Sequence, residues 1–410
     1  MKKISKFSLI FVFIIALASC KKDAVNLELK EIMLNNVGKQ LVESDNGFGI
    51  DLFKIVAANN NENKNQMISP LSVSLALSMA YNGADKETKT AMENTLQLTG
   101  LSTDEININN KQLSEALMGV DGRVDFNIAN SIWYKENFSV LPDFITTNEN
   151  FYNAEVRALD FGNSNSADVI NNWVADKTND KIIKIVDNIP SNIVMYLINA
   201  IYFKGNWKYQ FDKSDNQDLP FYLTNGTTKT VEMMKQTADL KTMANDDFYL
   251  VELEYGQGNF VMDLFLPNDD KNVLDIINSL DNDNWNSWMN SLSGAHETTI
   301  VLPPFKFEYE QLLNEALASM GMGIAFDENQ SDFSKINTDN QLFISEVKHK
   351  TFIELNEKGT EAAAVTSVSF GITSVGPGGE IIFDKPFMFA IREVSTGAIL
   401  FLGVLENPER

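Results

Sequence analysis

Residues 357–373 read EKGTEAAAVTSVSFGIT, and the short run GPGG follows at residues 376–379. Every second residue from Thr360 is small at first and then apolar, on a face made of Thr360, Ala362, Ala364, Thr366, Val368, Phe370 and Ile372. A period of two with one apolar face is typical of a half-buried strand, whereas the glycines and proline that follow are typical of a loop. The pattern predicts a loop whose first part could slide between two existing strands, because no bulky side chain at its start would block the gap.

The sequence around this segment predicts further strands. Residues 194–203 are almost continuously apolar, as expected of a central strand covered on both faces. Residues 347–355 alternate between apolar and polar side chains, which predicts a strand that runs straight into the quoted segment. Two more strands are predicted at residues 381–391 and 399–405.

Helical patterns occur earlier in the chain. Ser69 precedes Pro70 and a mostly apolar run to Met79, so a hydroxyl can cap a buried helix whose first position is proline. Amphipathic helices are predicted around Phe48 and Trp173. Since there is no internal repeat and no interior linker rich in Pro, Gly or Ser, one α+β domain is predicted over residues 46–410, with the loop at about residues 357–380.

The N-terminus has the three parts of a secretion signal. Lys2, Lys3 and Lys6 form a basic region, residues 7–17 an apolar region, and Leu17-Ala18-Ser19-Cys20 a small-residue cleavage site. The apolar run is shorter than the roughly 20 residues that a membrane-spanning helix needs. The cleavage site resembles a bacterial lipobox, which implies cleavage before Cys20 and a diacylglycerol on its thiol.

This resemblance divides the chain into a signal peptide at residues 1–19, a lipidated cysteine with its tether at residues 20–45, and the folded domain. It implies a bacterial cell-envelope lipoprotein at the outer membrane or cell surface, facing the periplasm or the exterior. The membrane would be a partner only through Cys20. No disulfide is possible, because Cys20 is the only cysteine.

The charge of the chain excludes one class of partner. Lys and Arg number 33 against 56 Asp and Glu, a net charge of −23, and removal of the three leader lysines lowers it to about −26. A surface this acidic repels phosphate backbones, so no nucleic-acid partner is expected. The hydrophobic fraction of 44% is enough for one large core.

Sequence motifs of enzymes are missing. There are only two histidines, His296 and His349, and there is neither a Gly-x-Ser-x-Gly elbow nor a Walker loop. The glycines at residues 376–379 do not precede a helical pattern and are interpreted as extra length in the loop. With the one cysteine assigned to lipid, no catalytic triad, cofactor site or metal site is predicted, and the chain is expected not to be an enzyme.

Several separate motifs resemble those of the serpin family, and they occur in the family's order. They are Ser69-Pro70-Leu71-Ser72 with Asn82-Gly83-Ala84, Asn172-Trp173-Val174 with Thr178, Asn199-Ala200-Ile201-Tyr202-Phe203-Lys204-Gly205-Asn206-Trp207, Val231-Glu232-Met233-Met234, Asp332-Phe333-Ser334, Phe383-Asp384-Lys385-Pro386-Phe387, and Phe401-Leu402-Gly403-Val404 with Asn407-Pro408. The resemblance covers roughly residues 46–410. It implies the serpin fold: a large, mostly antiparallel central sheet, further sheets, about eight or nine helices and an exposed reactive-centre loop.

The resemblance also assigns roles to individual residues. The hinge of the loop would comprise Glu357, Gly359, Thr360, Glu361, Ala362, Ala363 and Ala364. The shutter, a polar cluster where the central sheet opens, would comprise Ser69, Ser72, Asn199 and His349. The breach, where insertion begins, would comprise Trp207 and Glu357. Many serpins pair this glutamate with a lysine after Leu-Pro; here that position is Pro304, and Lys306 is the nearest substitute.

The function implied by the resemblance is suicide inhibition of a serine protease. The protease would form an acyl-enzyme with the loop, the cut loop would insert into the sheet, and a monomeric inhibitor would hold its target covalently. The family's spacing from Glu357 places the scissile bond between Thr373 and Ser374. Because the loop is slightly longer than in familiar serpins, Val375 and Gly376 are the alternative.

The loop sequence also indicates which proteases would cut it. No Lys or Arg lies between Gly359 and Glu380, and Ile372, Thr373 and Val375 are small or branched. This favours elastase-like or subtilisin-like targets over trypsin-like ones. Two alternative functions stay open: a non-inhibitory serpin-fold binding or scaffold lipoprotein at the cell surface, and a solute-binding lipoprotein, which suits the leader but not the motifs.

Overall fold

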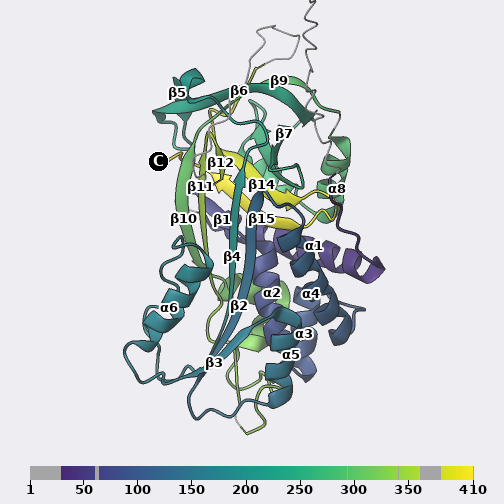
Figure 1. Ribbon diagram of the computed structural model, residues 1–410, viewed down its shortest axis with the longest axis vertical. Coiled ribbons are helices and arrows are strands. Elements are labelled where there is room, and N and C mark those ends of the chain that lie inside the picture. The colour runs from purple at the N-terminus through teal and green to yellow at the C-terminus, as the bar shows by residue number, and fades with distance from the viewer. Residues whose placement is uncertain (1–28, 61–63, 293, 340, 361–379, 410) are drawn as a thin grey trace, which may run out of the picture.

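The computed structural model describes residues 29–409 except residues 61–63, 293, 340 and 361–379 (Figure 1). Within these residues the chain forms nine α-helices and fifteen strands. The helices are α1 (Asn36–Ala58), α2 (Pro70–Tyr81), α3 (Lys86–Thr95), α4 (Thr103–Gly119), α5 (Pro142–Tyr152), α6 (Ser166–Lys177), α7 (Val273–Asn278), α8 (Asn282–Ser291) and α9 (Asn314–Leu317).

One sheet has six strands in the order β10-β11-β12-β4-β2-β3, and its long strands follow the long axis of the molecule (Figure 1). Neighbouring strands are antiparallel except β2 and β3, which are parallel. It is therefore the large, mostly antiparallel sheet that the sequence predicted. Its strands are β2 (Val124–Lys135), β3 (Glu155–Leu159), β4 (Met195–Asn206), β10 (Phe305–Leu312), β11 (Lys348–Asn356) and β12 (Gly359–Thr360).

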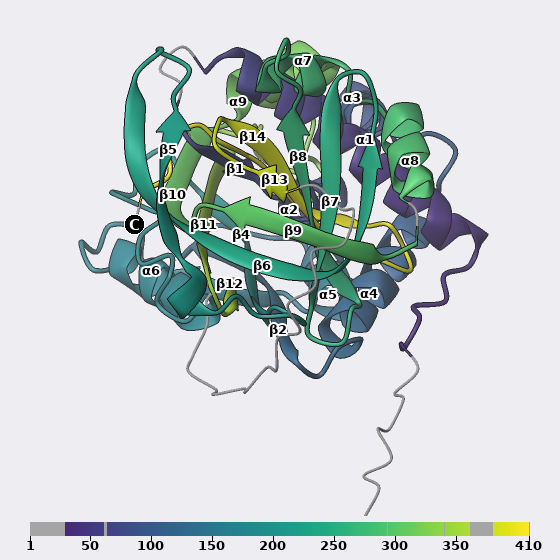
Figure 2. The same cartoon turned by 90° about the horizontal axis from the view of Figure 1, so that it is seen from above.

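The other sheet has nine strands in the order β1-β15-β14-β8-β7-β6-β9-β13, with β5 paired to β6. Seen from above, β6 and β9 cross the end of the molecule (Figure 2). Its strands are β1 (Gln66–Ile68), β5 (Gln217–Tyr222), β6 (Thr228–Ala244), β7 (Phe248–Tyr255), β8 (Phe260–Pro267), β9 (His296–Leu302), β13 (Glu380–Ile382), β14 (Phe387–Glu393) and β15 (Ile399–Leu405).

The single strand predicted at residues 381–391 is two strands in the structure. β13 pairs in parallel with β9, whereas β14 lies between β15 and β8. Pro386 separates them, and proline has no backbone N–H to continue a ladder. The prediction of one continuous strand here was therefore wrong.

Helix α2 lies in the core and packs against both β4 and β15. Ser69 accepts a hydrogen bond from the backbone N–H of Ser72, and Pro70 opens the helix, as the sequence predicted. On the other face of β4 and β2, α6 covers a smaller apolar cluster that includes Trp133, Ile170 and Val174. The six-stranded sheet therefore has helices on both faces.

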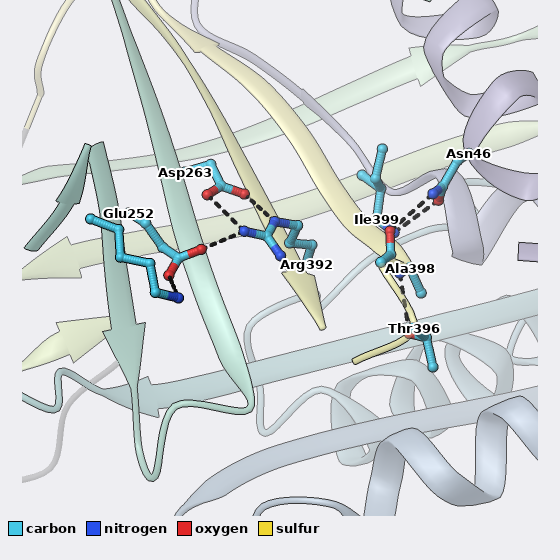
Figure 3. A network of polar contacts seen from close by, with 9 residues as sticks. Asn46, Glu252, Asp263, Arg392, Thr396, Ala398 and Ile399 are labelled. Atoms are coloured by element: carbon cyan, nitrogen blue, oxygen red, sulfur yellow. Dashed lines mark hydrogen bonds and ion pairs between the residues drawn. The ribbon is translucent and has the colours of Figure 1, made fainter. Parts of the chain in front are cut away.

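A charge network with a buried centre spans four adjacent strands of the nine-stranded sheet (Figure 3). Arg392 of β14 donates to both oxygens of Asp263 on β8, at 2.6 and 3.3 Å, and also contacts Glu252 of β7. Lys241 of β6 reaches the second oxygen of Glu252 at 2.7 Å. Burial raises the pKa of Asp263 to about 6, although Arg392 opposes the shift. The buried Arg392 and the partly exposed Lys241 thus face two buried carboxylates.

The folded part begins earlier than residue 46, where the sequence placed it. Helix α1 starts at Asn36, and Asn35 caps it by accepting from the N–H of Gly38 at 2.7 Å. Before the helix, Asn259 donates to the carbonyl of Lys30 at 2.6 Å, and the N–H of Ile32 donates to Ser395 at 2.9 Å. Residues 29–45 are therefore part of the body rather than of a tether.

No helix in the described part of the chain is long and apolar enough to cross a membrane.

Candidate functional site

The hinge forms a hairpin at one end of the six-stranded sheet. β11 ends at Asn356, the chain turns at Glu357 and Lys358, and β12 returns between β11 and β4. Thr360 lies opposite Leu355 on one side and Gly205 on the other. The predicted strand was therefore right in position, but it does not run straight on: the chain reverses and has already placed two residues inside the sheet.

Gly359 is the residue that permits this reversal. Its φ is +148°, a conformation that side-chain-bearing residues rarely adopt. A Cβ added there would lie 2.1 Å from the carbonyl oxygen of Gly205. The close approach of the two backbones therefore requires glycine at position 359.

Thr360 is buried at the breach, with 4% of its surface exposed. Its Oγ1 lies 2.6 Å from the hydroxyl of Tyr255, which is itself buried. The Tyr255 ring stacks on Trp207 at a centroid distance of 4.3 Å, and the Trp207 indole N–H donates to the carbonyl of Asn356 at 3.0 Å. One aromatic pair thus holds both strands of the hairpin.

Glu357 does not pair with Lys306. Its Oε1 accepts a hydrogen bond from the amide of Asn216 at 2.7 Å, and the same amide donates to Glu232 at 3.2 Å. Lys306 instead lies 3.6 Å from Glu354, because its place on β10 is directly opposite that residue of β11. A neutral amide rather than a lysine therefore bonds to Glu357, and the substitution by Lys306 suggested by the sequence was wrong.

Further along β4 and β11, from Ala200 and Lys350 away from the hinge, the space beside the two strands is hollow. A cavity of about 580 Å³ is lined by Asn199 and its neighbours on β4, by His349 on β11 and by Ser72 on α2. Each of the two strands pairs with β12 at the hinge end and with its outer neighbour, β2 or β10. The cavity lies in line with β12, which makes it a continuation of the path that β12 begins.

The shutter residues Ser69, Ser72 and His349 meet as predicted. The backbone N–H of Ser69 donates to Nε2 of His349 at 3.0 Å, and the Ser69 hydroxyl caps the N–H of Ser72 at 3.3 Å. Because Nε2 accepts this bond, the ring is neutral, and burial lowers its pKa to about 4. His349 therefore links β11 to the start of α2 without carrying charge.

Asn199 lines the same cavity but bonds elsewhere. Its amide donates to Oδ1 of Asn130 on β2 at 2.7 Å, and Asn130 in turn donates to the carbonyl of Tyr152 at 2.7 Å. The side-chain oxygen of Asn199 is buried without a hydrogen-bond partner. An unpaired buried acceptor lowers the stability of the folded state, so a hydrogen bond from a donor that enters the cavity would be favourable.

The sequence analysis did not identify four residues of the site: Tyr255, Asn216, Asn130 and Thr351. The hydroxyl of Thr351 donates to the carbonyl of Met67 at 2.7 Å. Only Thr351 carried a signal, because it lies on the same strand face as His349. The others come from segments that are distant in sequence, where no local pattern indicates a contact with the hinge or the shutter.

Some predicted site residues lie outside the described residues. They are Cys20, the hinge residues Glu361, Ala362, Ala363 and Ala364, and the two pairs proposed for the scissile bond, Thr373 with Ser374 and Val375 with Gly376. These remain predictions.

The geometry defines a class of protein. In this class the first residues of the hinge already form a short strand inside the main sheet, and a cavity lies further along the same two neighbouring strands. A family model described as Serpin (serine protease inhibitor) matches residues 43–408. This chain belongs to the serpin family, whose members are protease inhibitors in general rather than enzymes.

Individual relatives cover nearly the whole chain. An uncharacterized serpin-like protein of Methanosarcina acetivorans is 31% identical, over 90% of this chain and 86% of its own. The human leukocyte elastase inhibitor is 31% identical, over 90% of this chain and 100% of its own. The crystal structure of tengpin, a thermophilic serpin, in its native state superposes with a TM-score of 0.81 at 33% identity, covering 92% of this chain and 96% of tengpin.

Proposed function

We propose that this protein traps serine proteases as a suicide substrate, by inserting its cleaved loop between β4 and β11. The observation that carries the proposal is the position of β12, which lies between these strands with a cavity of about 580 Å³ ahead of it. Strand addition to a sheet is an established binding mode, because the backbone hydrogen bonds of the new strand supply affinity.

The register of β12 indicates where the rest of the loop would go. Thr360 faces Leu355 and Gly205, and each two-residue step along the inserted strand moves two residues back along β11 and β4. Continued in this way, Thr366 reaches the level of both His349 and Asn199. Its hydroxyl could then donate to the unpaired oxygen of Asn199. Insertion would thereby satisfy a polar atom that has no hydrogen-bond partner before insertion.

The inserted length is sufficient to move a protease across the molecule. Fifteen residues from Gly359 to Thr373, at about 3.3 Å each, span roughly 50 Å. Trapping requires insertion to outrun deacylation, so the uncleaved state must be held kinetically rather than by equilibrium stability.

The proposed targets are elastase-like and subtilisin-like proteases, cleaving after Thr373 or, in the alternative register, after Val375. The loop sequence has no basic residue for a trypsin-like pocket. A relative at 31% identity is named leukocyte elastase inhibitor, which supports the same class of target.

A direct test mixes the protein with elastase, subtilisin and trypsin and looks for an SDS-resistant complex. Elastase or subtilisin should form one, and trypsin should not. Mass spectrometry of the released peptide should show a start at Ser374, or at Gly376 for the alternative. Cleavage without any stable complex, by any of the proteases, would contradict trapping and favour a scaffold role.

Anchoring by lipid on Cys20 is the second part of the proposal. It rests on the lipobox-like Leu17-Ala18-Ser19-Cys20 and on the basic and apolar regions before it. The mature protein would be a monomeric envelope lipoprotein. Mass spectrometry of its N-terminal peptide tests this, since lipidation adds acyl mass to Cys20, whereas an unmodified Cys20 would contradict it.

A further inference from the structure

We infer that the tether, which is now limited to residues 20–28, holds the hinge end of the molecule toward the bilayer, so that the reactive loop works next to the membrane surface. The inference rests on the lipidation of Cys20 proposed above. It follows from two observations: where the described chain begins, and how few residues separate that point from Cys20.

The described chain begins beside the breach. Leu29 packs against the turn between β7 and β8: a Cβ added to Gly258 would lie 3.6 Å from Cδ2 of Leu29. The same turn starts at Tyr255, which bonds to the hinge through Thr360. Its Gly256 donates from the backbone to the carbonyl of Asn206, the last residue of β4. The tether therefore leaves the body at the level of the hinge.

Further contacts fix this exit point. The carbonyl of Lys30 accepts from Asn259, and the Lys30 ammonium donates to the carbonyl of Gly119 at 2.8 Å. The segment then continues through the bond between Ile32 and Ser395 into α1. Three separate elements hold residues 30–32, so these residues move with the body. The greatest distance between the body and the lipid on Cys20 is therefore set by the residues between Cys20 and Leu29.

The reach of the tether is short compared with the body. Nine residues lead from Cys20 to Leu29, and at no more than about 3.6 Å each they span at most about 32 Å. From Asn206 to Met195, β4 alone extends about 36 Å away from the hinge end. If the opposite end faced the bilayer, Leu29 would lie beyond the reach of the tether. The fully inverted orientation is therefore excluded, and the hinge end stays within about 32 Å of the bilayer.

This orientation restricts the partner. A single-domain serine protease of about 240 residues has a radius of gyration near 18 Å, and hence a diameter of about 45 Å. It exceeds the greatest gap the tether allows, so a protease must approach the loop from the side. The site would select proteases that are small and work near the membrane, and would exclude large assemblies.

The test uses energy transfer from protein to bilayer. The chain from Cys20 carries one thiol, which can be coupled to maleimide lipid in phosphatidylcholine vesicles that also contain an acceptor on a lipid headgroup. A donor dye is attached through an azide-bearing residue at Arg123, exposed beside the hinge-end turn, or at Ser191, exposed before the far end of β4. Vesicle coupling makes the geometry measurable whether or not cells lipidate Cys20.

Transfer from position 123 should exceed transfer from position 191 by at least about twofold, because the two ends differ by a strand length. A matched variant with a 40-residue Gly-Ser insertion between Asp23 and Ala24 should remove the difference and speed the capture of a protease coupled to a large carrier. Equal transfer from the two positions with the natural tether, or stronger transfer from 191, would overturn the orientation. An unmodified Cys20 in protein from cells would instead overturn the anchoring on which it rests.

Discussion

The hydroxyl of Tyr255 lies 2.6 Å from Oγ1 of Thr360, so a single hydrogen bond joins the nine-stranded sheet to the first inward-facing residue of the hinge. Both residues are buried, and the Tyr255 ring is fixed by its stack on Trp207. This bond attaches the hairpin of β11 and β12 to the nine-stranded sheet, and the opening of the hairpin can be measured.

Tyr255→Phe should loosen the hinge without leaving a hole. Loss of a buried hydrogen bond costs about 1 kcal/mol, so opening of β12 should become roughly five- to tenfold more frequent. Hydrogen–deuterium exchange of a peptide covering residues 355–360 measures this directly. Thr360→Ser keeps the hydroxyl and is the matched control; equal exchange in Tyr255→Phe and wild type would show that the bond does not hold the hinge.

Gly359→Ala should expel β12, because the new Cβ would lie 2.1 Å from the carbonyl oxygen of Gly205 at a φ of +148°. A strained backbone of this kind costs about 1–3 kcal/mol even without the clash. Exchange at residues 355–360 should then approach that of an open loop. Gly226→Ala is the control, because Gly226 also has a positive φ but nothing lies within 4 Å of its Cβ position. Protection unchanged from wild type would contradict the close approach.

Thr360→Arg should turn the inhibitor into a substrate. Burying a guanidinium at a position that is 4% exposed costs several kcal/mol. Slower insertion lets deacylation win, so the amount of inhibitor consumed per protease should rise several-fold in an SDS-gel titration. Glu361→Arg, on the opposite strand face by sequence alternation, should trap nearly as well as wild type. Unchanged stoichiometry in Thr360→Arg would rule out insertion of this face.

Acid should weaken the shutter. Burial holds the pKa of His349 at about 4, below its usual 6.5. Between these two pH values His349 is protonated in the unfolded chain but not in the native state. The neutral ring's stabilisation is present above pH 6.5 and is lost as the pH falls toward 4, by about 2 kcal/mol between pH 7 and pH 5. The pKa values of Asp45 and Asp263 are raised to about 7 and about 6, and these groups act in the opposite direction. The measurement is therefore the pH dependence of the unfolding free energy in wild type minus that in His349→Gln. A difference that stays flat from pH 7 to pH 5 would contradict the buried neutral ring.

Sequence patterns anticipated the long strands and the capped start of α2, because alternation and a capping serine are local signals. The meeting of Ser69 with His349 was implied only by the resemblance to serpins, since no local pattern links residues 280 positions apart. They did not anticipate the reversal at Glu357 and Lys358. Alternation is the same whether a strand continues or turns back, and only the φ of Gly359 distinguishes the two. The bond between Asn199 and Asn130 was also missed, since it depends on which strand lies beside β4.

The partner of Glu357 was missed for a related reason. Lys306 is close in the sequence motif, but the antiparallel register of β10 and β11 places it opposite Glu354. Asn216 precedes β5, and nothing in its local sequence indicates proximity to the hinge. Contacts between distant segments follow from register and topology, which periodicity alone does not supply.

The buried charges around Arg392 have a consequence for how the molecule folds. The arginine meets Asp263 on β8 and Glu252 on β7, and Lys241 on β6 completes the set. If β14, β8 or β7 slipped by one residue, its charged side chain would swap faces and leave an unmatched charge in the interior. A misaligned sheet is therefore disfavoured by the cost of an unpaired buried charge, so the network favours a single alignment of β7, β8 and β14.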